Sequence, residues 1–419
     1  MSGKSKIIIG TKISVLLPFC NLSKIIVIDE QNWNHKQSDI NPRFDARQIA
    51  EWLAKNFSAK LILTTPAPSV ENFSEKLKRK KVNPSADEAG KKKSNLKLID
   101  LKMEKFKGNY TFLSDELIYQ IQANLEEKKK ILILHNRKGL ANYVFCKECG
   151  HVFKCPECQI SLVYSTSNKK LSCPLCNYSE EILPLCPKCS GPNIMFKGQG
   201  VEKIKNELQK EFSQAEVLIL EKSTRKDLNT KTSKNYDIVI GTEFVINKIN
   251  FAEFDLIAFT NFDQLLNRPD FRTQERAYQV FYTIKSQAPK SYFIIQTNQP
   301  DNVVLQSIKD NLPDKFYKSE LENRKILNYP PFCQLIKIIA KDLKQKNVEY
   351  KSKKLVLDLQ KKLDKTIEVL GPFENFPQKE FNKYVYNIIL KAPLNFSLPK
   401  IFKIIPNDFI IDANPEKLN

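Results

Sequence analysis

The chain has 419 residues, of which 42% are hydrophobic and 10% aromatic, so it can bury sizeable cores and is not a disordered protein. Its formal net charge of +20 favours an anionic partner such as a nucleic acid, although a general Lys-rich bias would have the same effect. No run of 18 apolar residues is present, so no membrane span is expected. The first residues do not resemble a signal peptide, and we expect a cytoplasmic protein with reduced thiols.

Short β-branched runs separated by helical patterns predict a parallel α/β fold. From the N-terminus, buried strands are expected at Ile7–Gly10, Ile25–Asp29 and Lys60–Thr64. A similar pair of strands, Ile238–Gly241 and Leu256–Thr260, repeats the spacing of fifteen residues between a Gly and the next strand. This repeat suggests two related α/β lobes, but any parallel α/β protein contains such strands.

The rest of the chain is predicted to contain a basic loop, a C-terminal domain and further strands and helices. The stretch 75–94 is Lys-rich with little apolar content and is expected to be a solvated basic loop. After Pro330 and Pro331, strands such as Leu335–Ala340 alternate with a Lys-rich helix over Asn347–Leu363, which indicates a separate α+β domain. Additional strands are expected at Ile131–Leu134, Val217–Leu220 and Tyr292–Gln296, and helices at Asp45–Phe57, Asp115–Glu127 and Gly200–Phe212.

The most specific signal is a cluster of cysteines. Eight of the ten form four Cys-x-x-Cys pairs, Cys146/Cys149, Cys155/Cys158, Cys173/Cys176 and Cys186/Cys189. Two intervening residues let both thiolates of one tight turn reach a single tetrahedral zinc ion, so four pairs predict two structural zinc sites. The other two, Cys20 and Cys333, are isolated and are expected to be ordinary buried thiols.

Two pairings of the cysteines remain open. A nested arrangement joins Cys146, Cys149, Cys186 and Cys189 around zinc 1, and it joins Cys155, Cys158, Cys173 and Cys176 around zinc 2. A cross-brace instead joins the first pair with the third and the second with the fourth. We favour nesting, because the fourteen residues between the inner pairs are close to the usual ribbon spacing.

The segments around this module resemble the PriA family of bacterial replication-restart helicases, primosomal protein N′. Arg137-Lys138-Gly139 leads into the cysteines, and a Gly-x-Gly segment at 198–200 leaves them, as in that family. The resemblance extends over almost the whole chain. It includes Asp29-Glu30 at the acidic box, Lys36 and Pro42–Arg47 in an aromatic-rich loop, Asp270-Phe271-Arg272 with Glu275, Tyr329–Phe332, and the closing stretch Ile410–Pro415.

The resemblance implies two RecA-like helicase lobes that clamp ATP with Mg²⁺ and move 3′–5′ along DNA. The organisation expected from it is a partial first lobe at 1–108, the start of lobe two at 109–145, the zinc module at 146–192, the remainder of lobe two at 193–328, and a C-terminal α+β domain at 329–419. Lys36, Arg43, Phe44 and Arg47 would be DNA-binding candidates. The implied partners are forked DNA or single-stranded/duplex junctions, single-stranded-DNA-binding protein and primosome proteins.

The chain departs from the family where ATP chemistry takes place. No Gly-x-x-x-x-Gly-Lys-Ser/Thr loop exists, and only Asp29 and Glu30 remain of the acidic box, as vestigial catalytic residues. The arginine-finger motif is represented by the segment 283–290, in which Lys285 and Lys290 stand where Arg is expected. The first lobe is also expected to be incomplete at its N-terminus, either because the relative has decayed or because the gene is truncated.

These departures favour a protein of replication restart that binds DNA at stalled forks, in the cytoplasm with the nucleoid, and whose ATPase motor is degenerate. One alternative is an active ATP-dependent 3′–5′ DNA helicase that uses unusual residues or a companion chain. A second alternative is an RNA- or ribosome-associated zinc-ribbon protein, for which only the basic charge argues.

Overall fold

A computed structural model describes residues 6–38, 40–41, 43–74, 95–135, 143–157, 161–165, 170–173, 178–197, 200–220, 236–242, 245–246 and 248–418. The chain divides into two compact units. Unit 1 combines the N-terminal elements with the short stretch Asp270–Glu275 and with the chain from Tyr317 onward, and unit 2 holds the remainder. No helix in the described ranges is both long and apolar enough to cross a lipid bilayer.

Unit 2 is built on a six-stranded sheet in which every neighbouring pair of strands runs parallel. In order across the sheet, the strands are β10 (Val217–Leu220), β11 (Ile238–Gly241), β4 (Ile131–Leu134), β12 (Leu256–Phe259), β13 (Tyr292–Thr297) and β3 (Leu96–Asp100). β11, β4 and β12 are buried at every position. Their continuous apolar sequences are therefore those of central strands whose two faces are both covered.

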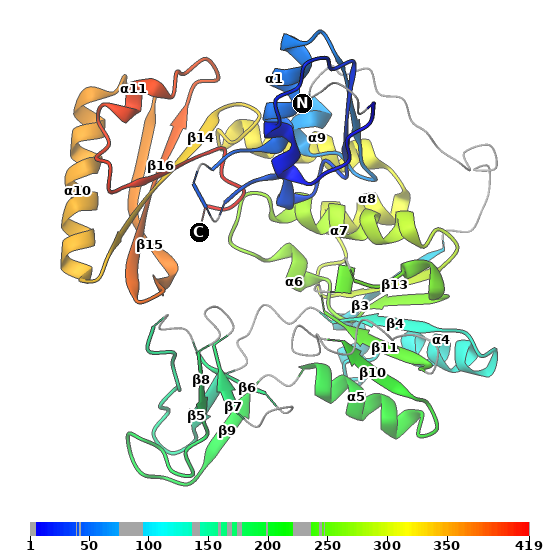
Figure 1. Cartoon of the computed structure of the whole chain (residues 1–419). Coiled ribbons are helices and arrows are strands. Elements are labelled where there is room, and N and C mark those ends of the chain that lie inside the picture. Colours follow the sequence, from blue (N-terminus) through cyan, green and yellow to red (C-terminus); the bar gives the residue numbers. More distant parts are fainter. Residues whose placement is uncertain are drawn as a thin grey trace. The chain divides into compact units, whose positions relative to one another are not determined.

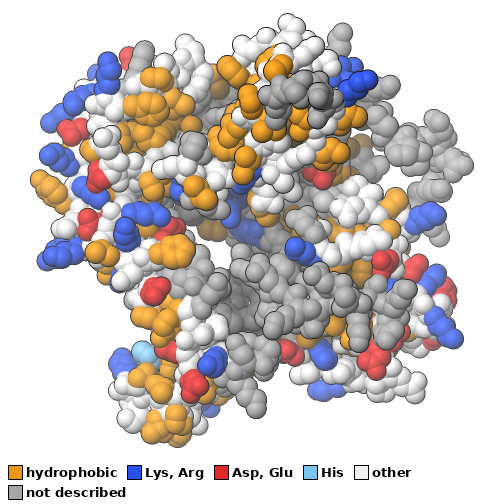
Figure 2. Space-filling model, viewed as in Figure 1, with side chains coloured by type: hydrophobic (Ala, Val, Ile, Leu, Met, Phe, Trp, Pro, Cys, Tyr) orange, Lys and Arg blue, Asp and Glu red, His pale blue; other side chains and the backbone are white. Residues whose placement is uncertain are grey.

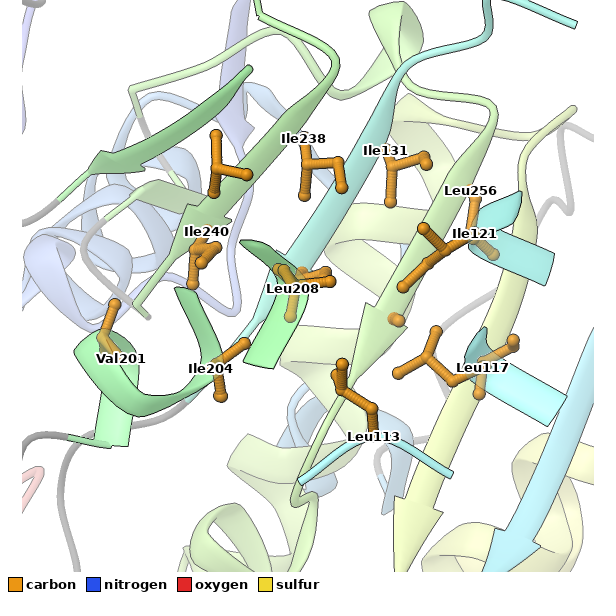
Figure 3. Close-up of a cluster of buried hydrophobic side chains, with 14 of the residues drawn as sticks. Leu113, Leu117, Ile121, Ile131, Val201, Ile204, Leu208, Ile238, Ile240 and Leu256 are labelled. Atoms are coloured by element: carbon orange, nitrogen blue, oxygen red, sulfur yellow. The ribbon is translucent and has the colours of Figure 1, made fainter. Parts of the chain in front are cut away.

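Helices cover both faces of this sheet. On one face, α4 (Asp115–Glu126) and α5 (Gly200–Glu211) place an apolar stripe against the strands, as Figure 3 shows for Leu117, Ile121, Ile204 and Leu208. On the other face, Phe281 of α7 (Thr273–Gln287) lies with its ring 5.4 Å from that of Phe293. Its neighbour Ile294 packs in the α4–α5 cluster, because successive strand residues point to opposite faces.

Short helices complete unit 2, and local caps define where helices begin. The short helices are α3 (Leu101–Phe106), α6 (Asp263–Leu266) and α8 (Val303–Asp310). At α4 the Leu117 amide donates to the Ser114 hydroxyl over 3.2 Å, and Asp115 and Glu116 occupy the first turn. A hydroxyl cap followed by acidic residues satisfies the free amides and complements the helix dipole, so α4 begins close to where the sequence predicts.

Two expectations about the N-terminal half need correction. The predicted first domain extends to residue 108, but β3 lies inside it and pairs with β13 of the unit 2 sheet. The predicted strand at Ile7–Gly10 is not a strand in the structure, and Ile7 and Ile9 are 82% and 95% exposed. Among the described residues of the N-terminal half, the proposed repeat therefore has no counterpart to β11, because an apolar run forms a strand only where a neighbouring strand accepts its hydrogen bonds.

The C-terminal part of unit 1 is an antiparallel α+β structure, as the sequence predicts (Figure 1). It groups with the N-terminal elements in one compact unit, however, and does not form the separate domain that was expected. Its strands lie in the order β15 (Glu368–Glu380), β16 (Lys383–Ala392), β14 (Gln334–Asp342) and β17 (Ile410–Ala413). Helix α10 (Gln345–Lys362) packs on one face through Val348, Leu355 and Leu359, and the short α11 (Pro399–Phe402) adds Ile401 to the same core.

The N-terminal part of unit 1 has a sheet of two parallel strands, β1 (Lys24–Ile28) and β2 (Lys60–Thr64). Helix α1 (Ala46–Asn56) packs against both strands, and α2 (Val70–Ser74) follows β2. The side chain of Asp45 caps α1 by accepting a hydrogen bond from the Arg47 amide over 2.9 Å. Helix α9 (Pro313–Ile326) contributes Glu320 and Arg324 to the same unit.

An acid–arginine cluster (Glu71, Arg272, Glu275, Glu320, Arg324) ties together distant segments of unit 1. Arg324 donates to Glu275 and to Glu320 over 2.8 Å each, and Arg272 donates to both oxygens of Glu71 over 3.0 and 2.6 Å. Glu275 also accepts from the first amide of α2, that of Val70, over 2.8 Å. Each carboxylate of this cluster thus accepts hydrogen bonds from an arginine guanidinium group. Such charge-assisted hydrogen bonds offset the cost of removing the buried charges from water.

Burial alone raises the pKa of Glu275, but the charges of Arg324 and Arg272 outweigh it and lower this pKa to about 2. The Glu275 carboxylate therefore stabilises the folded state fully above its ordinary pKa of 4.5. This contribution is lost as the pH falls from 4.5 towards 2, because the proton that enters must break the ion pairs.

We predict that Glu275→Gln lowers the free energy of unfolding of unit 1 by about 3–5 kcal/mol at pH 7, since it leaves two buried guanidinium groups short of a partner. Urea denaturation measures the change. Glu349→Gln is the matched control, because Glu349 pairs with Lys353 on the surface and its loss should cost less than about 0.5 kcal/mol. Between pH 4.5 and 3, Glu275→Gln should lose less stability than the parent. An equal loss of stability in the two proteins would contradict the role assigned to the Glu275 carboxylate.

Candidate metal centre

The outer cysteines sit on two similar turns at one end of a two-stranded ribbon. β5 (Tyr143–Cys146) pairs antiparallel with β9 (Ile194–Lys197), so that Cys146 lies opposite Ile194. In the first turn the Gly150 amide donates to the Cys146 carbonyl over 2.9 Å, and in the second the Ser190 amide donates to the Cys186 carbonyl over 2.8 Å. Each turn ends at a residue with positive φ, 69° at Gly150 and 54° at Ser190, which lets the chain reverse sharply.

These turns bring four thiols together. The Sγ atoms of Cys146, Cys149, Cys186 and Cys189 lie within 4.8 Å of one another. Cys146 and Cys189 are separated by 3.6 Å, and Cys149 and Cys186 by 3.7 Å. A disulfide requires about 2.05 Å between sulfurs. Four sulfurs placed tetrahedrally at 2.3 Å from an ion lie about 3.8 Å apart. The distances thus fit a tetrahedral metal site and exclude a disulfide in this geometry.

The electrostatics of the site also favour a cation. Burial opposes ionisation of the Cys186 thiol, but the amides of Lys188 and Cys189 outweigh it and lower the pKa of Cys186 to about 7. The pKa of Cys189 is raised to about 12 despite the Gly191 amide, which lowers it, because the Cys149 thiol shares the same small space. The Cys186 thiolate therefore forms readily while the Cys189 thiol resists ionisation. A divalent ion at the centre of the four sulfurs would stabilise both as thiolates.

The sequence patterns did not single out Glu148, which supports this site from outside. Its carboxylate accepts from the Asn193 amide group over 2.8 Å and lies 3.9 Å from the Cys189 sulfur. The Glu148 carboxylate lies directly against Gly191, where an added Cβ would come 1.4 Å from one of its oxygens. A glycine in the second turn is the signal that could have revealed this contact, because only glycine leaves space for the carboxylate.

The inner cysteines are only partly described. Cys155 and Cys173 are buried in an apolar cluster with Phe153, Leu162 and Leu171. Cys173 directly follows β7 (Lys170–Ser172), which pairs with β6 (Val163–Ser165) and β8 (Ser179–Glu181) in a small antiparallel sheet. Cys158 and Cys176 lie outside the described residues, so the second zinc site stays a prediction. The grouping of the outer four cysteines is the one that the nested arrangement predicts.

The two isolated cysteines differ from each other. Cys333 is buried and its pKa is raised to about 11 because of that burial, as expected for an ordinary interior thiol. Cys20 was also expected to be buried, but it is exposed. The residues on either side of this thiol, 17–23, form no regular element in the structure.

The two acidic residues, Asp29 and Glu30, follow β1 but do not form a pair of free carboxylates. Glu30 is 1% exposed, and both of its oxygens are occupied. One accepts from the Ser69 amide over 2.6 Å, and the other accepts from the Ser69 hydroxyl over 3.1 Å and from Asn72 over 2.7 Å. Burial raises the pKa of Glu30. Asp29 is exposed and adopts a positive φ of 53°.

The DNA-binding candidates are occupied within unit 1. Lys36 is 3% exposed, and its ammonium group lies 2.9 Å from an oxygen of Asp412. Arg43 lies 3.4 Å from the other oxygen of that carboxylate. Arg47 pairs with Asp45 at 2.6 Å and with Glu416 at 2.5 Å, and Phe44 is half-buried. In this conformation the closing segment of the chain neutralises the three cations, so their contact with DNA stays a prediction.

Comparison with known proteins gives one family. Residues 325–405 match the family model described as the primosomal protein N C-terminal domain. Curated relatives named replication restart protein PriA are 32% identical over 397 residues in Borreliella burgdorferi, covering 93% of this chain and 60% of the relative. In Rickettsia prowazekii the identity is 30% over 417 residues, covering 96% and 64%. In Bacillus subtilis it is 25% over 419 residues, covering 96% and 51%. The chain therefore spans only about half to two thirds of the length of these relatives.

We predict that Cys186→Ser removes one metal ion per molecule and loosens the ribbon around β5 and β9. Loss of a ligand should weaken this site by more than about a hundredfold, since even loss of an outer-shell partner costs 10–100-fold. Mass spectrometry under native conditions, together with limited proteolysis, measures both effects. Cys20→Ser is the matched control, because it removes an exposed thiol outside the cluster. An unchanged metal content in Cys186→Ser would contradict the assignment.

Proposed function

The chain belongs to the PriA family, and on that premise we propose that it binds DNA at stalled forks and acts in replication restart and primosome assembly. The observation that carries this proposal is that PriA relatives match 93–96% of the chain, so the likeness includes the cysteine module and the C-terminal domain together. The proposed ligand is forked DNA or a single-stranded/duplex junction, bound where chromosomal DNA is found, in the cytoplasm. Single-stranded-DNA-binding protein and primosome proteins are the proposed protein partners.

The metal is proposed to be zinc, with two ions per chain. The outer four thiols have the spacing of a tetrahedral thiolate site, and all-thiolate tetrahedral sites are typical of structural zinc. Cys155 and Cys173 are proposed to bind the second ion with Cys158 and Cys176. Four protein ligands leave no open coordination position, so the ions are proposed to stabilise the ribbon module rather than to catalyse a reaction.

The N-terminal part of unit 1 and the part of unit 2 built on the six-stranded sheet are proposed to derive from the two RecA-like lobes of such a helicase, with a motor that no longer works. The residues present do not fit ATP with Mg²⁺: the Glu30 oxygens are committed to Ser69 and Asn72, and no phosphate-binding loop exists in the sequence. Lys285, at the expected finger position, lies over the rings of Phe281 and Tyr282 at 5.7 and 5.6 Å. Burial lowers the pKa of Lys285, which makes it a poor substitute for a planar arginine fork.

We predict that DNA binding is largely independent of sequence and weakens steeply with salt, because neutralised phosphates release counterions. Lys147 and Lys188 stand on the two cysteine turns and are exposed. Replacing both by Gln should reduce the slope of log affinity against log salt by about 2, one for each lost phosphate contact. Fluorescence anisotropy with a labelled fork measures the slope.

The control for this experiment is the double variant Lys102→Gln/Lys309→Gln, which removes the same charge from exposed positions elsewhere. It should leave the slope unchanged. A slope near zero for the parent chain would contradict DNA binding through phosphates. Equal or tighter binding of a matched RNA fork would favour the RNA-associated alternative.

We predict that the chain does not hydrolyse ATP above background, with or without forked DNA. An arginine finger alone contributes about 10³–10⁵ in rate, and the phosphate cradle is absent as well. Phosphate release assays test this, with Asp29→Asn expected to give the same trace as the parent. Turnover that forked DNA stimulates and Asp29→Asn abolishes would overturn the degenerate-motor proposal and favour the active helicase.

A further inference from the structure

Helix α10 of unit 1 has apolar side chains on both of its faces. Its inner face packs on the four-stranded sheet through Val348, Leu355 and Leu359. On the outer face, Tyr350 and Leu357 are 69% and 56% exposed. They are seven residues apart, which is about two helical turns, so they lie along one line parallel to the helix axis with about 10 Å between them. We call these two side chains the outer stripe, and the core of the unit does not explain them.

Lysines border the outer stripe on both sides. These lysines are exposed and repeat at the same spacing of seven residues, with Lys346 and Lys353 on one side and Lys354 and Lys361 on the other. At about 100° per residue, all four lie within about 60° of Tyr350 around the helix axis, and the acidic Glu349 and Asp358 lie farther round. In Figure 2, Lys and Arg side chains gather along the margin where Figure 1 places α10. The outer face is thus an apolar line between two rows of positive charge.

This arrangement is typical of a helix that recognises another helix. In two-stranded coiled coils, apolar residues recur at fixed places in each repeat of seven, and charged residues beside them form ion pairs that select the partner. Tyrosine is also among the residues that contribute most to binding energy at protein interfaces. Rows of lysine on both sides of the stripe favour acidic rows on the partner, because like charges across the contact would repel.

We propose that the outer face of α10 binds an amphipathic helix of a partner protein, with apolar residues along one line and Asp or Glu on both sides of that line. A second copy of this chain fits less well, because its own α10 would bring lysines against lysines. The backbone of a nucleic acid would use the lysines, but it would leave Tyr350 and Leu357 without apolar contacts. The stripe and the charges together therefore favour an acidic helix.

Three labelled synthetic peptides test this proposal on the full chain. Each peptide has about three heptads, Leu once in every heptad and Ala as the helix-forming background, and the positions on both sides of Leu are all Glu, all Gln or all Lys. Fluorescence anisotropy at low salt measures their binding. The Glu peptide should bind about tenfold more tightly than the Gln peptide, because several exposed ion pairs add together. The Lys peptide should not bind.

The double variant Tyr350→Gln/Leu357→Gln should weaken binding of the Glu peptide by about tenfold or more, because it removes the apolar centre of the contact. Glutamine is a good helix former and both side chains are exposed, so the variant should keep the parent's melting temperature. The matched control is Leu394→Gln/Phe402→Gln. It removes two apolar side chains of similar exposure, 59% and 55%, from the same α+β structure, and it should leave peptide binding unchanged.

The proposal would be overturned if the Glu peptide did not bind, bound no better than the Lys peptide, or bound the Tyr350→Gln/Leu357→Gln variant as tightly as the parent. Duplex DNA or vesicles of anionic phospholipid are added in separate titrations. If either bound through Tyr350 and Leu357 and the Glu peptide did not, the face would belong to that ligand instead. The acidic helix and the role in replication restart fail separately, because the peptides are measured without DNA and the forks without peptide.

Discussion

The fold of unit 1 depends on the buried pairing of Glu275 with Arg324 and Arg272. Segments from four parts of the sequence meet there: α2 after β2, the start of α7, α9 and, through Glu416, the end of the chain, since the Arg272 Nε lies 3.8 Å from that carboxylate. Neither arginine could be buried without these carboxylates. The cluster therefore requires that all four segments be in place at once, which couples the N-terminal elements to the C-terminal domain within this unit.

The cluster also explains why Lys36, Arg43 and Arg47 differ from what their sequence context suggests. Positive side chains in a loop with an aromatic residue favour nucleic-acid binding when only the sequence is considered. In the fold, the segment from Asp412 to Glu416 is held against the same loop, and its carboxylates form ion pairs with the three cations. Pairs formed by residues 369 or more positions apart in the sequence have no local pattern by which they could be predicted.

Elements with strong local signals could be predicted well. The central strands of unit 2 are continuous β-branched runs, α4 begins at a hydroxyl cap, and the Cys-x-x-Cys turns bring four thiols to metal spacing. Predictions that required knowledge of neighbours were less successful. Ile7–Gly10 has the composition of a strand but no partner strand among the described residues, and β3 pairs across the six-stranded sheet with β13 rather than with the N-terminal strands. Composition determines that a segment can be a strand, whereas pairing depends on what lies beside it.

We propose a DNA-binding chain that zinc stabilises and that has no working motor, and one measurement tests this proposal most directly. The affinity of the zinc-loaded chain for a labelled fork is determined with and without ATP and Mg²⁺. A helicase couples nucleotide binding to DNA binding, and coupling between two sites typically changes affinity by about 5–150-fold. The account predicts tight, salt-sensitive binding whose affinity is the same in both conditions. A fork affinity that nucleotide changes by about fivefold or more, or the absence of fork binding, would contradict it.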